Sequence, residues 1–234
     1  MLIGGLQKLS LLDYPDCLSA VVFTVGCNFR CHFCYNPQLV VPGSEKDKDY
    51  SLIAEDNLFR FLESRRHKLD SVVVTGGEPT MHQNLPEFII KIKKLGYLIK
   101  LDTNGTNPEM LKNLMAKKLI DYIAMDIKAP LENYKKVTGV EVSLKNIEKS
   151  IRMIIESKVP YEFRTTIVPG LHNEDDVAKM GQLIKGAEKW YLQSFRGQQP
   201  LVNNEFEKKL PYTEEILKAM CERAQQYVKF CKIR

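Results

Sequence analysis

Short apolar runs alternate with longer amphipathic segments along this chain. The runs are rich in β-branched and aromatic residues, which is typical of buried strands. Between them, apolar residues recur at helical spacing, as in Leu85–Leu95 and Ile147–Ile155, and a last helix is expected over Thr213–Val228. The expected strands are Leu18–Val25, Ser71–Thr75, Tyr97–Asp102, Tyr122–Asp126, Tyr161–Val168 and Trp190–Phe195.

Strand–helix units in series predict an α/β fold with a parallel sheet and helices outside it. Six units are too few to close an eight-stranded barrel, so we expect a partial (β/α)6 barrel. We expect one domain over residues 1–234, with an N-terminal extension (1–17), six βα units (18–195) and a C-terminal loop and helix (196–234). In such folds the functional residues gather at the carboxyl ends of the strands.

Composition adds little that is unusual. Hydrophobic residues make up 44% of the 234 residues and charged residues 27%, as in ordinary globular proteins. The net charge of +5 is mild and its lysines are scattered, which argues against nucleic acid as a partner. No apolar run approaches the roughly 20 residues of a membrane span, and the N-terminus does not resemble a secretion signal. These features predict a cytoplasmic protein, monomeric on its own.

Cys27, Cys31 and Cys34 fall within eight residues, directly after the first expected strand. In a chain without an export signal, clustered cysteines are more typical of metal ligands than of disulfides. Three thiolates would leave one iron of a four-iron cluster open, and an open coordination site is a mark of chemistry. The alternatives are a zinc site completed by His32, which would have to fold back beside Cys31, and an iron–sulfur electron carrier, which normally supplies four cysteines.

The spacing Cys-x3-Cys-x2-Cys, with the aromatic Phe33 before the third cysteine, resembles the signature of the radical S-adenosylmethionine (SAM) superfamily. The resemblance implies a [4Fe–4S] cluster whose free iron binds the amino and carboxylate groups of SAM. One electron from the reduced cluster would then split SAM into methionine and a 5′-deoxyadenosyl radical. No catalytic side chain beyond the cluster and SAM is expected.

Gly76-Gly77-Glu78-Pro79 follows the second expected strand and resembles the glycine-glycine-glutamate motif of this superfamily. Glycine lets the backbone approach a ligand closely, and carbonyl and carboxylate oxygens suit the ammonium group of SAM. A side chain at Gly77 is therefore expected to fill ligand space and weaken SAM binding. An ordinary turn is the alternative.

Further SAM contacts are implied by the resemblance, each with a simpler alternative. Asn104 would bind the ribose or merely form a strand-exit turn. Asp126 and Lys128 would lie near the SAM carboxylate and ribose or only bind each other. Arg164 would clamp the carboxylate or lie on an edge strand. The implied SAM-binding set is Phe33, Tyr35, Gly76, Gly77, Glu78, Thr103, Asn104, Asp126, Lys128, Arg164 and Gln193, the last standing where relatives present a histidine nearby.

Asp102, Thr103 and Asp126 are also candidate ligands of a monovalent cation near the SAM carboxylate. The remaining conspicuous residues are expected to be structural. The histidines His67, His82 and His172 lie in polar or turn-rich segments and should be exposed. Cys221 should be a core residue of the last helix, Cys231 has no spaced partner, and Cys17 is assigned no chemistry.

The opening segment Gly5–Pro15 resembles the activating proteins of glycyl radical enzymes, above all those of anaerobic ribonucleoside-triphosphate reductase, and the similarity continues to Gly170. This resemblance implies an anaerobic activase that abstracts hydrogen from one glycine of a partner enzyme, with flavodoxin or ferredoxin as electron donor. After Cys34 the chain has no second cysteine group for an auxiliary cluster. The alternative is a radical SAM enzyme with a small-molecule substrate, of the deazaguanine synthase type.

Overall fold

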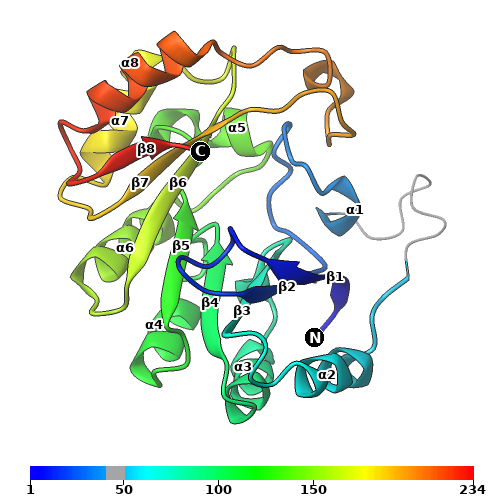
Figure 1. Cartoon of the computed structure of the whole chain (residues 1–234). Helices are drawn as coiled ribbons and strands as arrows, with labels where there is room; N and C mark the ends of the chain where they lie inside the picture. The colour runs from blue at the N-terminus through cyan, green and yellow to red at the C-terminus, as the bar shows by residue number, and fades with distance from the viewer. Residues whose placement is uncertain (41–50) are drawn as a thin grey trace. The chain divides into compact units, whose positions relative to one another are not determined.

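A computed structural model describes residues 1–40 and 51–234 of the chain (Figure 1). Over these residues the strands form one eight-stranded sheet in chain order, from β1 to β8. Because β1 pairs antiparallel with β2 and the other printed pairs are parallel, the sheet is mostly parallel. The strands are β1 Ile3–Ser10, β2 Ser19–Thr24, β3 Ser71–Gly76, β4 Leu98–Thr103, β5 Tyr122–Asp126, β6 Tyr161–Ile167, β7 Trp190–Ser194 and β8 Cys231–Ile233.

The α/β class and the six expected strands are confirmed, and they correspond to β2 through β7. The expected and observed ends differ by one residue at most, as for β2, which runs from Ser19 to Thr24 instead of Leu18–Val25. The agreement follows from composition, because these strands are nearly continuous apolar runs. Such runs are required where a parallel strand is buried on both faces of the sheet.

The outer strands β1 and β8 were not expected. β1 contains Gly4, Gly5, Gln7 and Lys8, so it lacks a clear alternation, and it forms a hairpin with β2 in which Leu6 pairs with Val22. β8 has three residues, too few to show a period, and its Cys231 pairs with Trp190 of β7. Part of the supposed N-terminal extension is therefore a strand of the sheet.

The helices follow the expected pattern. Two of the predicted helical segments are α3 and α6, whereas the last helix ends at Ala224, before the expected Val228. In the part of the chain that the structure describes, no helix is long and apolar enough to cross a membrane. The α-helices are α1 Pro37–Val40, α2 Glu55–Ser64, α3 Leu85–Lys94, α4 Pro108–Ala116, α5 Tyr134–Thr138, α6 Leu144–Glu156, α7 Glu174–Leu183 and α8 Glu214–Ala224.

The chain packs as two compact units. The first comprises Met1–Asn28, Gln38–Thr103 and Glu109–Ile123. Its core contains β3, whose Val72, Val73 and Val74 are fully buried, and the apolar face of α3. The candidate site residues of this unit follow or end β2, β3 and β4.

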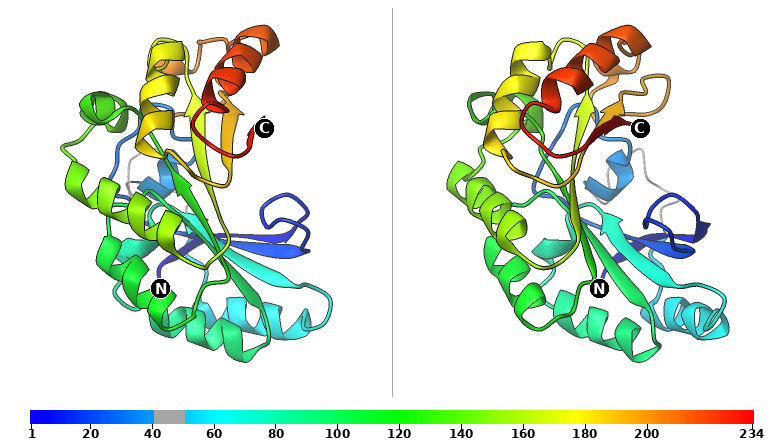
Figure 2. Two further views of the ribbon diagram at one scale, coloured as in Figure 1. Left: turned by 90° about the vertical axis from the view of Figure 1, so that its left-hand side faces the viewer. Right: turned by 60° about the vertical axis from the view of Figure 1, so that its left-hand side comes forward.

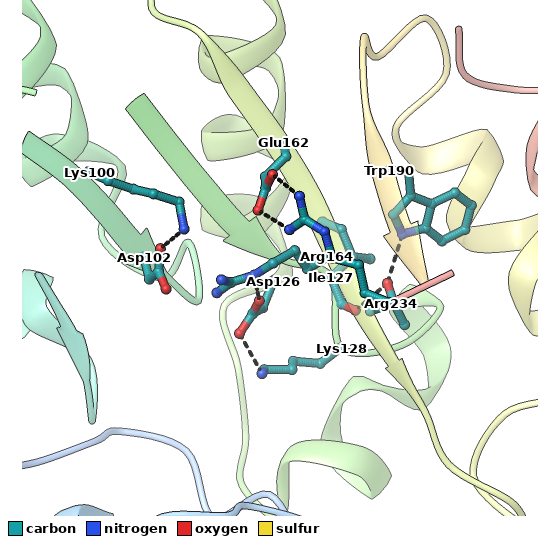
Figure 3. A network of polar contacts seen from close by, with 10 residues as sticks. Lys100, Asp102, Asp126, Ile127, Lys128, Glu162, Arg164, Trp190 and Arg234 are labelled. Atoms are coloured by element: carbon teal, nitrogen blue, oxygen red, sulfur yellow. Dashed lines mark hydrogen bonds and ion pairs between the residues drawn. The ribbon is translucent and has the colours of Figure 1, made fainter. Parts of the chain in front are cut away.

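The second unit comprises Phe29–Pro37, Asn104–Pro108 and Ala124–Arg234. Its core includes Trp190, whose indole Nε1 donates to Thr165 Oγ1 over 3.0 Å, and that hydroxyl donates to the carbonyl of Ile127 over 2.9 Å (Figure 3). The helices α7 and α8 lie side by side (Figures 1 and 2). Further candidate site residues of this unit lie on or directly after β5, β6 and β7.

Candidate functional site

Cys27 belongs to the first unit, and the residue before it is tightly fixed. Gly26 donates its N–H to the carbonyl of Leu39 over 2.7 Å and accepts a hydrogen bond from Glu78 N over 2.8 Å. The φ of Gly26 is +96°, a backbone conformation that residues with a side chain rarely adopt. The start of the cysteine loop is thus anchored to the turn that follows β3.

Both glycines of that turn are required by close backbone approach. A Cβ at Gly76 would lie 2.3 Å from Thr24 N, and a Cβ at Gly77 would lie 2.0 Å from the carbonyl oxygen of Gly26. The reason expected for Gly77 was therefore wrong. Its space is filled by the backbone of the cysteine loop, so a side chain there would displace the segment that carries Cys27.

Glu78 is buried, with 1% of its surface exposed. Its Oε1 accepts hydrogen bonds from Thr80 N (3.0 Å), Thr80 Oγ1 (2.5 Å) and Thr103 Oγ1 (2.8 Å). These bonds stabilise the charged carboxylate and fix its orientation. Thr103 thereby connects the end of β4 to the glycine-glycine-glutamate turn, a role that its position in the sequence did not reveal.

The second unit holds Cys31 and Cys34. Cys34 N donates to the carbonyl of Cys31 over 3.0 Å, so the two residues share a tight turn. This loop is attached to the end of α5, because Arg30 N donates to the carbonyl of Thr138 over 2.8 Å. Gly139 has φ +71° and a Cβ there would lie 2.7 Å from the carbonyl oxygen of Arg30, so the attachment needs glycine.

The loop's aromatic and histidine side chains pack within the same unit. The His32 ring is stacked on Phe206 with 5.6 Å between centroids, a packing role that gives the side chain a use other than zinc binding. Phe33 is buried and lies edge-on to His172, with 6.4 Å between their centroids. Tyr35 stacks on Phe195, and its hydroxyl accepts a hydrogen bond from Arg196 N over 2.8 Å. Phe33 and Tyr35 thus fix the loop to its surroundings.

Asp126, Lys128 and Arg164 form one charged network at the ends of β5 and β6 (Figure 3). Asp126 Oδ2 binds Lys128 Nζ and its Oδ1 binds Arg164 Nε, each over 2.9 Å. Burial alone would raise the pKa of Asp126, but Arg164 and Lys128 hold that pKa far below its usual range. The mutual salt bridge of Asp126 and Lys128 is present, and Arg164 does not lie on an edge strand, because β6 has β5 and β7 as neighbours.

Lys128 also interacts electrostatically with the cysteine loop. Burial would lower its pKa, but the negative charges of Asp126 and of the Cys31 and Cys34 thiolates raise it. Conversely, burial raises the pKa of Cys34, and the Lys128 ammonium acts against this. A cation beside two thiols favours their thiolate forms, which are the forms that bind metals.

The donor chemistry of the loop fits an iron–sulfur cluster. Its donors are the side chains of Cys27, Cys31 and Cys34, and thiolates are the usual ligands of such clusters. Within residues 1–40 and 51–234, no three His, Cys, Asp or Glu side chains are close enough together to hold a single metal ion. A cluster asks for something different, because each cysteine binds a different iron atom.

His172 was expected to be exposed, and that prediction was wrong. It is 2% exposed, its Nδ1 accepts from Val168 N over 3.0 Å, and its Nε2 is 2.8 Å from the carbonyl of Lys128. The ring therefore joins the segments that follow β5 and β6 and packs against Phe33. Because its segment reads as a turn, only tertiary structure reveals the burial. Of the other two histidines, His67 is exposed as expected, whereas His82 is half-buried and bonded to the carbonyl of Val25.

Other residues of the second unit were missed or reassigned. Tyr134 is fully buried, and its hydroxyl accepts a hydrogen bond from Lys128 N over 3.3 Å. This bond fixes the backbone directly after β5. Asn104 Oδ1 accepts from Thr106 N and Oγ1, so the strand-exit turn expected as its simpler role is present. Gln193 lies half-buried on β7, paired with Thr166.

The remaining cysteines have other contacts. Cys17 packs on a cluster that includes Tyr14 and Val73. Cys221 is buried as expected, but Cys231 does have a partner, since its Sγ lies 3.2 Å from that of Cys221. Lys100 is a further missed residue: its Nζ lies 2.8 Å from Asp102 Oδ1, and both side chains are buried (Figure 3). The sequence signal was a lysine interrupting the apolar strand Leu98–Thr103 two residues before an aspartate.

The three-cysteine loop follows the carboxyl end of the first parallel strand, where such folds gather functional residues, and it supplies the thiolates that hold iron–sulfur clusters. Comparison with known families agrees, since residues 21–184 match the radical SAM superfamily. The chain belongs to the radical SAM superfamily. Membership implies a [4Fe–4S] cluster and SAM as cofactors.

Individual relatives refine this assignment. A protein of Methanocaldococcus jannaschii, provisionally named a glycyl-radical enzyme activating enzyme, is 33% identical over 100% of this chain and 95% of its own. A protein of Saccharolobus islandicus, provisionally named a GTP 3′,8-cyclase, is 34% identical over 70% of this chain and 51% of its own. Among solved structures, Streptococcus suis SuiB bound to its precursor peptide SuiA matches with a TM-score of 0.67 and 14% identity over 92% of this chain. The chain spans about half the length of SuiB (48%), and this likeness confirms the predicted radical SAM fold.

Proposed function

We propose that this protein is a radical SAM activase that generates a glycyl radical in a partner enzyme, anaerobic ribonucleotide reductase. The observation that carries the proposal is the full-length similarity to a relative named for glycyl-radical enzyme activation. The opening segment Gly5–Pro15 supports it, because it resembles the same activases. In this proposal a reduced flavodoxin or ferredoxin supplies the electron and the protein acts in the cytoplasm.

The proposed cofactor ligands are Cys27, Cys31 and Cys34. When bound, the cluster and SAM would supply a 5′-deoxyadenosyl radical that removes hydrogen from the Cα of the partner's glycine. Lys128 would favour the thiolates of the second and third cysteines electrostatically. The anchored Gly26 would hold the first cysteine in place.

The chain's own residues would bind and orient SAM. The Glu78 carboxylate, whose orientation is fixed through Oε1, is suited to accept hydrogen bonds from the ammonium group of SAM. Lys128 and Arg164 are suited to the SAM carboxylate, because their network with Asp126 carries one excess positive charge. Asn104 holds its own turn through Oδ1, so a ribose contact would come from its amide N–H groups.

A small-molecule substrate is the second candidate, favoured by the 34% identity to the relative named a GTP 3′,8-cyclase. That relative is matched over only 51% of its length, whereas the activase relative is matched over 95%. The longer match is why the activase is preferred.

The test is anaerobic. Reconstituted protein is mixed with SAM, dithionite and anaerobic ribonucleotide reductase, and electron paramagnetic resonance (EPR) is recorded. The proposal expects a glycyl radical signal and an amount of 5′-deoxyadenosine that matches it. Both should be lost in Cys34→Ala. Both should be kept in the control Cys17→Ala, which removes a cysteine outside the loop. Partner with its radical-site glycine changed to alanine should give no signal. Formation of 5′-deoxyadenosine without a radical in this or other glycyl radical enzymes would contradict the activase proposal.

A further inference from the structure

A buried ion pair lies on β4 of the first unit. Lys100 and Asp102 are two residues apart on the strand, so their side chains lie on the same face. The Lys100 side chain is 2% exposed and that of Asp102 is 9% exposed, and Nζ lies 2.8 Å from Oδ1 (Figure 3). Lysine is almost never this buried unless it is paired, so the contact is a specific feature of the strand.

The pair lies next to a residue that belongs to the candidate site. Thr103 follows Asp102 at the end of β4, and its hydroxyl donates to Glu78 over 2.8 Å. Glu78 is the proposed acceptor of the SAM ammonium group. An uncompensated charge on Asp102 would therefore disturb the end of β4, which holds Glu78 in place through Thr103.

The donor set proposed for a monovalent cation does not fit a free cation. The Asp102 carboxylate already binds an ammonium group, and the Thr103 hydroxyl donates to Glu78. In the second unit, Asp126 binds both Lys128 and Arg164. Each carboxylate of the proposed set thus has at least one cationic partner from the chain itself.

We propose that the ammonium group of Lys100 takes the place of a monovalent cation at Asp102, so that SAM binding to this protein is independent of sodium and potassium. Lys100 is a positioning residue: it acts through Asp102 on the end of β4 and does not contact SAM. The proposal rests on the proposed SAM site. It replaces the expectation of a bound cation with a counter-ion built into the strand.

The variant Lys100→Met isolates this role. It keeps an unbranched apolar side chain but leaves Asp102 as a buried carboxylate without its ammonium partner, which is costly. A small cation from solution can then lower that cost. The matched control is Lys93→Met on α3, which removes a partly exposed ion pair with Asp121.

SAM affinity is measured on reconstituted protein, and thermal unfolding is measured on apo-protein. Both are recorded in choline, sodium and potassium chloride at equal ionic strength. Wild type and Lys93→Met should show the same affinity in all three salts. Lys100→Met should bind SAM about tenfold more weakly in choline, the loss expected if the disturbed end of β4 costs the one charged hydrogen bond between Thr103 and Glu78, and sodium or potassium should restore binding and raise its unfolding temperature. If Lys100→Met does not fold, the charge-neutral double variant Lys100→Met/Asp102→Asn should fold and show no response to the cations.

Tighter SAM binding by wild type in sodium or potassium than in choline would overturn the proposal. A Lys100→Met variant that binds SAM as tightly as wild type in choline, or that does not respond to the cations, would also overturn it. So would a double variant that responds to the cations. These readouts need no partner enzyme, so a missing glycyl radical would leave the proposal standing. If wild type binds no SAM in any of the salts, the radical SAM function itself fails, and this proposal fails with it.

Discussion

At the scale of single residues, Gly77 shows how the cofactor loop depends on backbone contact. A Cβ there would meet the Gly26 carbonyl oxygen at 2.0 Å. Gly77→Ala should therefore displace the start of the cysteine loop and lower both the iron content after reconstitution and the affinity for SAM. Gly96→Ala is the control for backbone strain: its φ of +95° costs an alanine about 1–2 kcal/mol, a strain that Gly77 does not carry, but its Cβ would meet nothing within 4 Å. Normal iron content in Gly77→Ala, or equal losses in both variants, would contradict this account.

His172 predicts a pH dependence of stability. Burial lowers its pKa below the ordinary value of 6.5, whereas the hydrogen bond to the Lys128 carbonyl and the charge of Asp176 act against burial and the Lys128 ammonium acts with it. Below pH 6.5 the unfolded chain binds a proton that the folded protein does not, so stability falls as the pH drops from 6.5 toward the folded pKa. The contribution is at most about 1.4 kcal/mol per pH unit.

The measurement is urea unfolding of the apo-protein between pH 7.5 and 5 (about the range in which histidine titrates). His172→Asn should be less stable at neutral pH, because Val168 N and the Lys128 carbonyl lose partners, and its stability should fall less steeply in acid. The half-buried His82, whose pKa burial also lowers, remains in both proteins and cancels in the comparison. Parallel curves for wild type and variant would show that His172 is not held neutral by the fold.

At the scale of elements, β6 matters because it presents Arg164 beside the end of β5. A guanidinium can bind Asp126 through Nε and still direct its other N–H groups elsewhere, whereas lysine is a single point charge. Arg164→Lys should keep the fold and the cluster but weaken SAM binding about tenfold, the loss expected for one charged hydrogen bond. Arg152→Lys on the exposed face of α6 is the control, and equal SAM affinity in both variants would remove Arg164 from the site.

The elements also show what sequence can and cannot predict. The strands β2–β7 were found because their apolar runs are long and continuous, and the cysteine and glycine motifs were found because each follows one of them. The hairpin strand β1 was missed because Gly4 and Gly5 interrupt its pattern. The three-residue β8 has no pattern at all. Both depend on pairing with a neighbour that is specified elsewhere in the chain.

At the scale of the whole molecule, the predicted site residues were chosen by their place after strands, and their partners came only from the structure. Lys100, Tyr134 and His172 were not among the predicted site residues, and they support the site through contacts with Asp102 and Lys128, which were. Their burial is a tertiary property, so a lysine in a strand or a histidine in a turn looks ordinary in the sequence. The chemistry was therefore predictable, whereas the groups that position it were not.

The central claim is that three cysteines hold a cluster that cleaves SAM. The most direct measurement is iron and sulfide analysis, with 5′-deoxyadenosine quantified after SAM and dithionite are added anaerobically. The account predicts iron and sulfide in equal amounts and 5′-deoxyadenosine, all lost when Cys27, Cys31 or Cys34 is replaced by alanine. Zinc in place of iron, or a cluster that survives the loss of any one of these cysteines and still cleaves SAM, would contradict it.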